Sequence, residues 1–337
     1  MSRIFKWSTP WSFGANFIPS TAINQLEMWQ ADTFDPETID RELGWAAKIG
    51  MGIMRVYLHD LLWVQDAEGF FQRMDRYLEI ASSHGIKTMF VFFDDCWSPD
   101  FALGKQPEPK PFTHNSGWVQ SPGSRVVDDP SQWGRLESYV KETLARFGND
   151  DRVVLWDLYN EPGNGRSGDH VTKSGLRVNA SLPLLKAVFQ WAREANPSQP
   201  LTAGAWNFCE EFYDLNKFMF ENSEVVTFHA YTKPGELRER INFIRYIAPG
   251  RPLLCSEYMA RPAGSTFKEC LPIFKECEIS AINWGLVAGK TNTIYPWGWN
   301  ESKGEPDPCF HDVFKENGEL LYPEEAEVFA AVSGTPS

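Results

Sequence analysis

Two glutamates follow apolar runs that are typical of buried strands, and they are the residues of this chain best suited to acid–base chemistry. Glu161 comes directly after the run 153–160 and is followed by Pro162. Glu257 comes directly after Leu253-Leu254-Cys255-Ser256. A carboxylate at the end of a hydrophobic strand packs poorly but serves well as an acid or a nucleophile. Glycoside hydrolysis through a covalent intermediate requires two such groups, about 5–5.5 Å apart.

A structural role is the alternative for each glutamate, because Asp and Glu also cap the helices that follow strands. Pro162 argues against this role for Glu161, since it suits a loop that turns away from the strand. The joint occurrence of two strand-end glutamates strengthens the functional interpretation of both.

The elements that must position these residues alternate regularly along the chain. Apolar segments typical of strands are separated by segments with helical periodicity, such as Ile39, Leu43 and Ala46. The expected strands lie at 12–16, 52–58, 88–93, the run before Glu161, 200–205, 225–229, the run before Glu257, and 280–285. A last helix is expected near 323–332.

This alternation predicts an α/β fold, a single (β/α)8 TIM barrel that covers residues 1–337 and has long loops after strands three and eight. An open, doubly wound sheet is the competing architecture. It is disfavoured because Gly14-Ala15-Asn16 after strand one is not the GxGxxG phosphate-binding turn that such sheets often carry.

Composition and charge restrict the partners of this chain. With 42% hydrophobic and 23% charged residues in 337, it is an ordinary globular protein. A net charge of −13 argues against nucleic acid and anionic membranes as partners, whereas a neutral carbohydrate is acceptable. The N-terminus lacks the apolar run of a secretory signal, and no run approaches the ~20 apolar residues of a membrane span. We therefore expect a cytoplasmic location; the sequence indicates no oligomeric state.

In a barrel the active site lies on the loops that follow the strands, so polar and aromatic residues at these points are expected to form one site. They are Arg55 and His59 after strand two, Asp94, Asp95 and Trp97 after strand three, Asn160 and Glu161 after strand four, Trp206 and Asn207 after strand five, His229 and Tyr231 after strand six, Glu257 after strand seven, and Trp284 in strand eight. The 14 Trp of the chain are suited to sugar faces as well as to a core.

This set of residues resembles the pattern of clan A glycoside hydrolases, most closely family 5, which contains cellulases, mannanases and exo-glucosidases. The resemblance covers residues 12–290. It rests on Arg at the end of strand two, Asn-Glu-Pro after strand four, His-x-Tyr after strand six, Glu after strand seven and Trp after strand eight. The chain departs from the family after strand three, where Asp94-Asp95-Cys96-Trp97 stands in place of a histidine that many members carry.

The resemblance implies a retaining β-glycosidase with Glu161 as acid/base and Glu257 as nucleophile. It also implies that Arg55 lies close to Glu257 and keeps it ionised, and that Asn160 binds the sugar 2-hydroxyl. The remaining expected substrate contacts are His59, Asp94, Trp97, Trp206 and Trp284, with His229 and Tyr231 orienting the two carboxylates.

Two other functions compete with this interpretation. A divalent metal in a barrel isomerase or hydrolase would use His59, Asp94, Asp95, His229 and Glu257, but no His-x-His follows strand one. A catalytically inactive carbohydrate-binding barrel is the non-enzyme alternative, against which the intact pair of glutamates argues. We predict an enzyme that uses no metal and no other cofactor.

The loops 96–130 and 286–322 are expected to wall a pocket, which favours exo-action or short oligosaccharides over a polymer-binding cleft. At least one of Trp118, Trp297 and Trp299 should then face the cavity. The histidines His114, His170 and His311 are expected at the loop surface, and the six cysteines are expected to be isolated, buried thiols.

Overall fold

The structure is a computed structural model that describes residues 10–165 and 175–334. Its eight parallel strands form one sheet in the order β5-β4-β3-β2-β1-β8-β7-β6. The strands are β1 (Phe13–Asn16), β2 (Ile53–Tyr57), β3 (Lys87–Asp94), β4 (Val153–Asn160), β5 (Leu201–Thr202), β6 (Val226–His229), β7 (Leu253–Tyr258) and β8 (Ser280–Trp284). A bridge between Ala205 and Phe228 joins the chain after β5 to β6, so the sheet curls into a nearly closed barrel.

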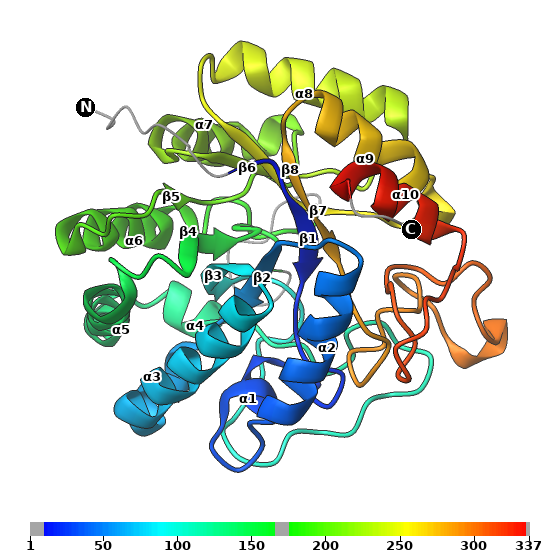
Figure 1. Ribbon diagram of the computed structural model, residues 1–337. Helices are drawn as coiled ribbons and strands as arrows, with labels where there is room; N and C mark the ends of the chain where they lie inside the picture. The colour runs from blue at the N-terminus through cyan, green and yellow to red at the C-terminus, as the bar shows by residue number, and fades with distance from the viewer. Residues whose placement is uncertain (1–9, 166–174, 335–337) are drawn as a thin grey trace.

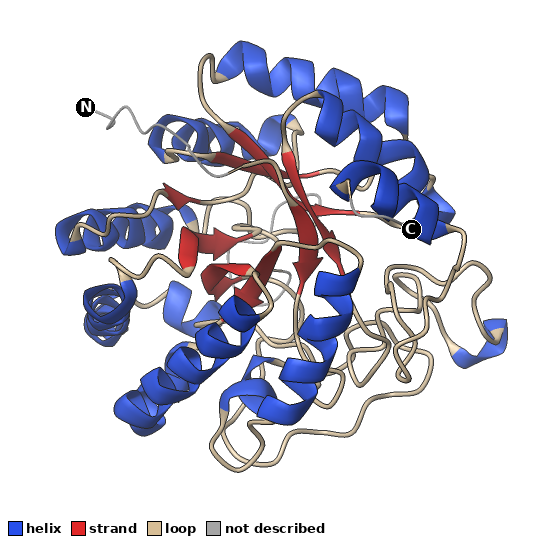
Figure 2. Ribbon diagram, viewed as in Figure 1, coloured by secondary structure: helices blue, strands red, loops and turns tan. Residues whose placement is uncertain are grey.

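Helices surround the strands, as Figure 1 and Figure 2 show. They are α1 (Gln25–Trp29), α2 (Pro36–Lys48), α3 (Asp60–Ser83), α4 (Ser124–Val127), α5 (Trp133–Phe147), α6 (Leu182–Ala195), α7 (Tyr213–Asn222), α8 (Pro234–Ile247), α9 (Phe267–Glu276) and α10 (Glu325–Ser333). The predicted (β/α)8 TIM barrel is therefore confirmed. Among the described residues, no helix combines the length and the apolar character needed to cross a bilayer.

Local sequence signals set the element boundaries. At the start of α2 the Asp35 side chain accepts a hydrogen bond from the backbone N–H of Thr38, and Pro36 occupies the first turn, where its missing N–H costs nothing. The helix then buries Ile39 and Leu43 against the barrel. Strand β5 is shorter than the predicted 200–205, because only Leu201 and Thr202 pair with β4 before the chain continues to the single bridge with β6.

The inside of the barrel changes from apolar to polar along the strands. One buried layer is wholly apolar, with Ile53, Met89, Leu155, Val225, Leu254 and Ile282. Side chains two positions further along a strand point the same way, so Arg55, Asp157 and Ser256 form the next layer toward the carboxyl ends. The strands thus carry polar groups to the end at which barrels place their active sites.

Candidate active site

Glu161 lies at the tip of β4, where the chain turns with φ = +44°. This left-handed conformation is uncommon for a residue with a side chain, and it occurs where surrounding contacts hold the backbone. His229 Nδ1 lies 2.7 Å from Glu161 Oε1, while the Cys96 thiol donates to Oε2 at 3.0 Å. The Asn164 amide donates to the same Oε2. The carboxyl group of Glu161 is therefore held on both oxygens.

Glu257 lies in β7 beside an irregularity in the pairing of β7 with β8. Such irregularities re-aim side chains and are frequent next to active sites. Its Oε1 accepts hydrogen bonds from Arg55 Nη1 at 2.9 Å and from the Tyr57 hydroxyl at 3.1 Å. Its Oε2 accepts from the Tyr231 hydroxyl at 2.8 Å. These contacts fix the carboxylate from two sides.

The two glutamates face one another across His229. A carboxylate oxygen of Glu161 and one of Glu257 lie within 4.8 Å of each other, and His229 Nδ1 is 3.4 Å from Glu257 Oε2. Burial lowers the pKa of His229 to about 4, so the ring is neutral near pH 7. The short separation suits a retaining pair, since inverting enzymes hold their carboxyl groups ~6.5–9.5 Å apart.

Arg55 connects Glu257 to the polar layer below it. The guanidinium is fully buried and binds Asp157 Oδ2 through Nε at 3.0 Å and Nη2 at 2.7 Å. It also donates to Asn16 Oδ1 at 2.8 Å and to Asn160 Oδ1 at 2.6 Å. Groups from β1, β2, β4 and β7 are thereby held in one network, which satisfies a charge that would otherwise be costly to bury.

Burial raises the pKa of both glutamates. For Glu257, burial and the neighbouring Glu161 carboxyl outweigh the opposing charge of Arg55, whereas we had expected the guanidinium to keep this group ionised. The two carboxyl groups still differ, because the direct ion pair with Arg55 is made by Glu257. A neighbouring cation favours the charged form, so the guanidinium favours ionisation of Glu257 before Glu161.

The pair opens into a cavity of about 770 Å³. One group of lining residues comes from the segments after β3 and from β8 with its following loop, namely Cys96, Trp97, His114, Asn115, Trp284 and Trp297. A second group comes from β4, β6 and the segments after β4 to β6, namely Asn160, Asn164, Trp206, His229, Tyr231, Thr232 and Arg240. The cavity combines indole surfaces with amide, hydroxyl and charged groups, as sugar recognition requires.

A model of the cellulase family, glycosyl hydrolase family 5, matches residues 49–288. The chain belongs to glycosyl hydrolase family 5. It is therefore a glycoside hydrolase that acts on β-linked sugars, and members of this family are retaining. No protein in a search of curated sequences matches this chain.

Solved structures support the fold of this family 5 enzyme. The endo-1,4-beta-D-mannanase from Thermotoga petrophila RKU-1 with maltose and glycerol is 15% identical, with a TM-score of 0.61 over 96% of this chain and 99% of that one. GH5_18 from Streptomyces cattleya in complex with GlcNAc is 13% identical, with a TM-score of 0.65 over 98% and 82%. The endo-1,4-beta-mannanase from Rhizomucor miehei is 11% identical, with a TM-score of 0.61 over 97% and 94%.

The structure brings most of the sequence-predicted residues to one cavity. Its lining includes Glu161, Glu257, Trp97, Asn160, Trp206, His229, Tyr231 and Trp284. Trp297 also lines it, which confirms that at least one loop tryptophan faces the cavity. Trp118 instead packs under it against Tyr57 and Trp284, and the Trp299 indole donates to Gly304 O.

Three predicted substrate contacts lie behind the cavity rather than on it, within the described residues. Arg55 is in the layer below. His59 accepts a hydrogen bond from Leu61 N at the start of α3, and its ring packs on Phe101. Asp94 accepts hydrogen bonds from Trp118 Nε1 at 2.8 Å and Asn160 Nδ2 at 2.9 Å, so it positions other side chains.

The expectation that His114 and His311 lie at the loop surface is wrong. They are 3% and 0% exposed, and both contact the ring of Phe310. The loops 96–130 and 286–322 are long enough to bury their own aromatic residues, so a loop position does not imply exposure here. His170 lies outside the described residues. All six cysteines are unpaired, as predicted, but their expected burial is wrong for Cys209, which is exposed, and for Cys277 and Cys309, which are partly buried.

Sequence reasoning missed several residues of the site. Tyr57 and Asp157 share the inward face of their strands with Arg55 and with the apolar layer, so strand periodicity could have identified them. Asn16 ends β1, a strand end that we did not include. Cys96 and Asn164 carry no such signal, because a thiol after an apolar strand is usually a packing residue.

The only described cluster of His, Cys, Asp or Glu with metal-binding spacing is Glu161, His229 and Glu257. The metal hypothesis requires His59, Asp94, Asp95, His229 and Glu257 to form one cluster, and they do not. Asp95, for example, accepts hydrogen bonds from Tyr159, Ser181 and the backbone N–H of Gly163. A three-residue cluster that coincides with the glycosidase pair needs no metal to explain it.

Proposed function

We propose that this enzyme is an exo-acting, retaining β-glycosidase in which Glu161 is the acid/base and Glu257 is the nucleophile. One observation carries the proposal: carboxylate oxygens of these residues come within 4.8 Å of each other at the wall of a single cavity. Asn160, Tyr231 and Trp284 line the same cavity and support a sugar bound between the pair.

The contacts of the two glutamates support different roles. In the first step Glu257 attacks the anomeric carbon while Glu161 protonates the departing oxygen, which leaves a glycosyl ester. In the second step Glu161 removes a proton from water, which attacks the same carbon and releases Glu257. Arg55 and Tyr57 stabilise the anionic Glu257, and burial raises the pKa of Glu161, which favours its protonated form.

The walls of the cavity support exo-action. Trp97 and His114 stand on the segment after β3, and Trp297 stands on the segment after β8. The His114 ring lies 5.4 Å from Trp97 and 6.3 Å from Trp297, centre to centre, so the two loops enclose one end of the cavity. A volume of about 770 Å³ lies within the ~300–1,000 Å³ of small-ligand pockets.

The first experiment identifies the sugar. A panel of nitrophenyl β-glucoside, galactoside, xyloside, mannoside and fucoside should contain at least one substrate. The mannoside takes priority because two of the similar structures are β-mannanases. With an oligosaccharide of the preferred sugar, exo-action releases monosaccharide from the first time point, whereas a ladder of intermediate lengths would exclude it. Hydrolysis of no glycoside of the panel would contradict the proposed exo-action.

The second experiment assigns the two glutamates. Glu257→Ala should lower kcat/KM for every leaving group, while Glu161→Ala should spare dinitrophenyl glycosides, whose departure needs no proton. Added azide should give a β-glycosyl azide with Glu161→Ala and an α-glycosyl azide with Glu257→Ala, as read by NMR. Equal losses for all leaving groups in both variants, without azide products, would disprove the assignment.

A further inference from the structure

The two cavity loops are joined by hydrogen bonds at His114 and Asn115. The backbone N–H of Asn115 donates to Thr291 O at 2.9 Å, and His114 Nδ1 lies 2.7 Å from Tyr295 O. A third contact runs from Asn292 Nδ2 to Lys110 O at 2.9 Å. The backbone that carries His114 and Asn115 is thereby held in place at the cavity wall.

The contact with Tyr295 determines which nitrogen of His114 carries hydrogen. A carbonyl oxygen only accepts, so Nδ1 must be the donor. Burial lowers the pKa of His114 to about 4, and the ring is therefore neutral near pH 7. Nε2 is then left with a free lone pair, and it makes no hydrogen bond within the described part of the chain. His114 offers the cavity one acceptor.

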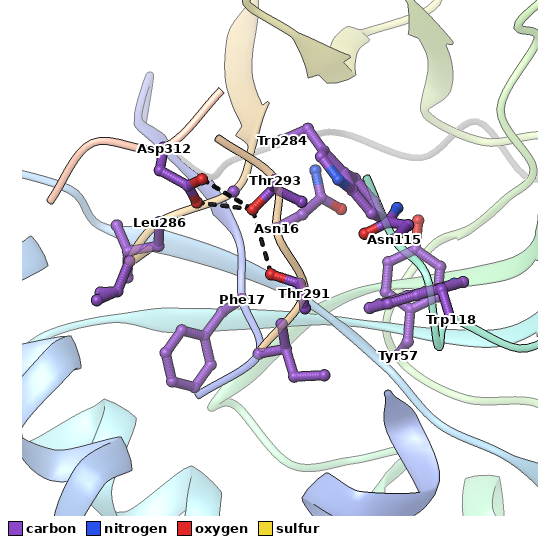
Figure 3. Close-up of a pocket in the computed structure, with 13 residues that line it drawn as sticks. Asn16, Phe17, Tyr57, Asn115, Trp118, Trp284, Leu286, Thr291, Thr293 and Asp312 are labelled. Atoms are coloured by element: carbon purple, nitrogen blue, oxygen red, sulfur yellow. Dashed lines mark hydrogen bonds between the residues drawn. The ribbon is translucent and has the colours of Figure 1, made fainter. Parts of the chain in front are cut away.

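Asn115 is the second polar group that the described chain leaves unsatisfied at this wall. Its side chain is 3% exposed, and its buried Oδ1 has no hydrogen-bond partner among the described residues. It borders the main cavity and also a small void of about 10 Å³ beneath Trp284, where Figure 3 shows it beside Trp284, Tyr57 and Trp118. A buried amide oxygen without a partner is costly, so Asn115 is a side chain whose hydrogen bonds the described chain leaves incomplete beside the cavity.

The surroundings of these two groups fit a sugar ring. Trp97, 45% exposed, and Trp297, 49% exposed, both contact the His114 ring and line the cavity. Trp284 borders both Asn115 and the main cavity. Indole faces cover the apolar faces of a sugar, while acceptors and amides at its edge bind hydroxyl groups.

We propose that Asn115 and His114 Nε2 each bind a hydroxyl group of the terminal, non-reducing sugar and so determine which glycone the enzyme hydrolyses. This inference rests on the proposed exo-glycosidase function. The hydroxyl at His114 donates to Nε2, and the hydroxyl at Asn115 accepts from Nδ2. Because Asn115 borders Trp284, which lines the cavity together with Glu161 and Glu257, we assign its hydroxyl to the sugar held between the two carboxyl groups.

The test measures kcat/KM of the wild-type enzyme and of its variants, each with the preferred aryl glycoside and with monodeoxy derivatives of it. Asn115→Gly removes the amide and tolerates the native φ of +46°. In the wild-type enzyme, removal of the hydroxyl that faces Asn115 should lower kcat/KM by about 5–150-fold, the effect of one buried polar group left unpaired. With the parent glycoside, kcat/KM of Asn115→Gly should be lower than that of the wild-type enzyme by a similar factor. Removal of the same hydroxyl from the substrate should then change kcat/KM of this variant by less than about twofold.

His114→Phe applies the same test to the second hydroxyl. Phenylalanine keeps a ring against Phe310 and Trp97 but removes Nε2. The deoxy derivative that lacks the hydroxyl at His114 should be penalised in the wild-type enzyme and not in this variant. Near-ultraviolet circular dichroism checks that both variants keep their tertiary structure.

Asn292→Gly is the matched control. Asn292 has a positive φ of +58° and joins the same two loops through Lys110 O, yet it does not line the cavity. This variant should keep the wild-type penalties for all deoxy glycosides. If Asn292→Gly lost the decrease in kcat/KM for a deoxy glycoside, the proposed direct contact of Asn115 or His114 with the sugar would be overturned. Displacement of the loops would then be enough to explain the effect.

The remaining outcomes separate the inference from the proposed function. Wild-type penalties that persist unchanged in Asn115→Gly and His114→Phe would disprove the inference, although the enzyme remains an exo-glycosidase. If the wild-type enzyme hydrolyses no glycoside of the panel, the proposed function fails, and the inference fails with it.

Discussion

Replacement of Cys96 by alanine should slow this enzyme to an extent that depends on the leaving group. The thiol donates to Glu161 Oε2 at 3.0 Å and lines the cavity. As Glu161 gives its proton to the departing oxygen, negative charge develops on its carboxylate, and a hydrogen-bond donor stabilises that charge. The Cys96 thiol should therefore stabilise the transition state more than the ground state.

The expected magnitude follows from the donors around Glu161. Oε2 receives hydrogen bonds from Cys96 and Asn164, and Oε1 contacts His229, so the variant loses one contact of three. A hydrogen bond to a charged group contributes ~1.5–3 kcal/mol, and the weak thiol donor belongs at the lower end. At ~1.4 kcal/mol per factor of ten, kcat/KM for a poor leaving group such as phenolate should fall about tenfold.

The assay is kcat/KM for aryl glycosides of decreasing leaving-group pKa with wild-type, Cys96→Ser and Cys96→Ala enzymes. Dinitrophenyl glycosides should react almost equally with all three, and serine should restore most of the rate with poor leaving groups because its hydroxyl still donates. Burial raises the pKa of Glu161 and the Cys96 hydrogen bond lowers it. The basic limb of the pH profile should therefore move to higher pH in Cys96→Ala. A uniform loss for all leaving groups, or a basic limb that stays in place, would refute this reasoning.

Three further predictions concern stability and metals. Asp157→Ala removes one of the two carboxylates that pair with the buried Arg55 guanidinium, and Glu257 remains. The free energy of unfolding in urea titrations should therefore fall by about 3 kcal/mol, the lower end of the range for a broken buried pair; a loss below about 1 kcal/mol would contradict the pairing. Burial raises the pKa of Glu42 from 4.5 to about 7, so the folded protein keeps a proton that the unfolded chain releases. Stability should then fall as pH rises from 4.5 to 7, and thermal unfolding of Glu42→Gln should show a flatter dependence, whereas equal slopes would contradict it. Dialysis against a chelator should leave aryl glycoside hydrolysis unchanged, and a loss that a divalent cation reverses would favour a metal at Glu161, His229 and Glu257.

The barrel could be predicted because its strands are buried on both faces. Strand β3 is nearly continuous in apolar residues from Thr88 to Phe93, and helical periodicity follows almost every strand. Strand β5 was predicted too long, because pairing depends on neighbouring strands that the local sequence does not show. The helix α4 was missed, since a four-residue helix has too few positions to display a period.

The strand-end rule located the cavity but not the part that each side chain plays in it. It could not distinguish Asn160, which reaches the cavity, from Asp94, which lies behind and holds Asn160 in place. The rule also fails for residues on long insertions. His114 is buried at the cavity because residues near 291–295 cover it, and no local pattern encodes a contact between segments so far apart.

Asp94 links the loop after β3 to the catalytic pair. Its Oδ2 accepts from Trp118, three residues beyond Asn115, while its Oδ1 accepts from Asn160 and from Cys96 N. Asn160 in turn accepts from Arg55, which binds Glu257. The segment that carries the proposed sugar contacts therefore shares one hydrogen-bond network with both carboxylates, since Cys96 also donates to Glu161. Burial raises the pKa of Asp94 to about 7, so protonation of this one carboxyl near neutral pH changes the acceptors available to both the loop and the catalytic residues.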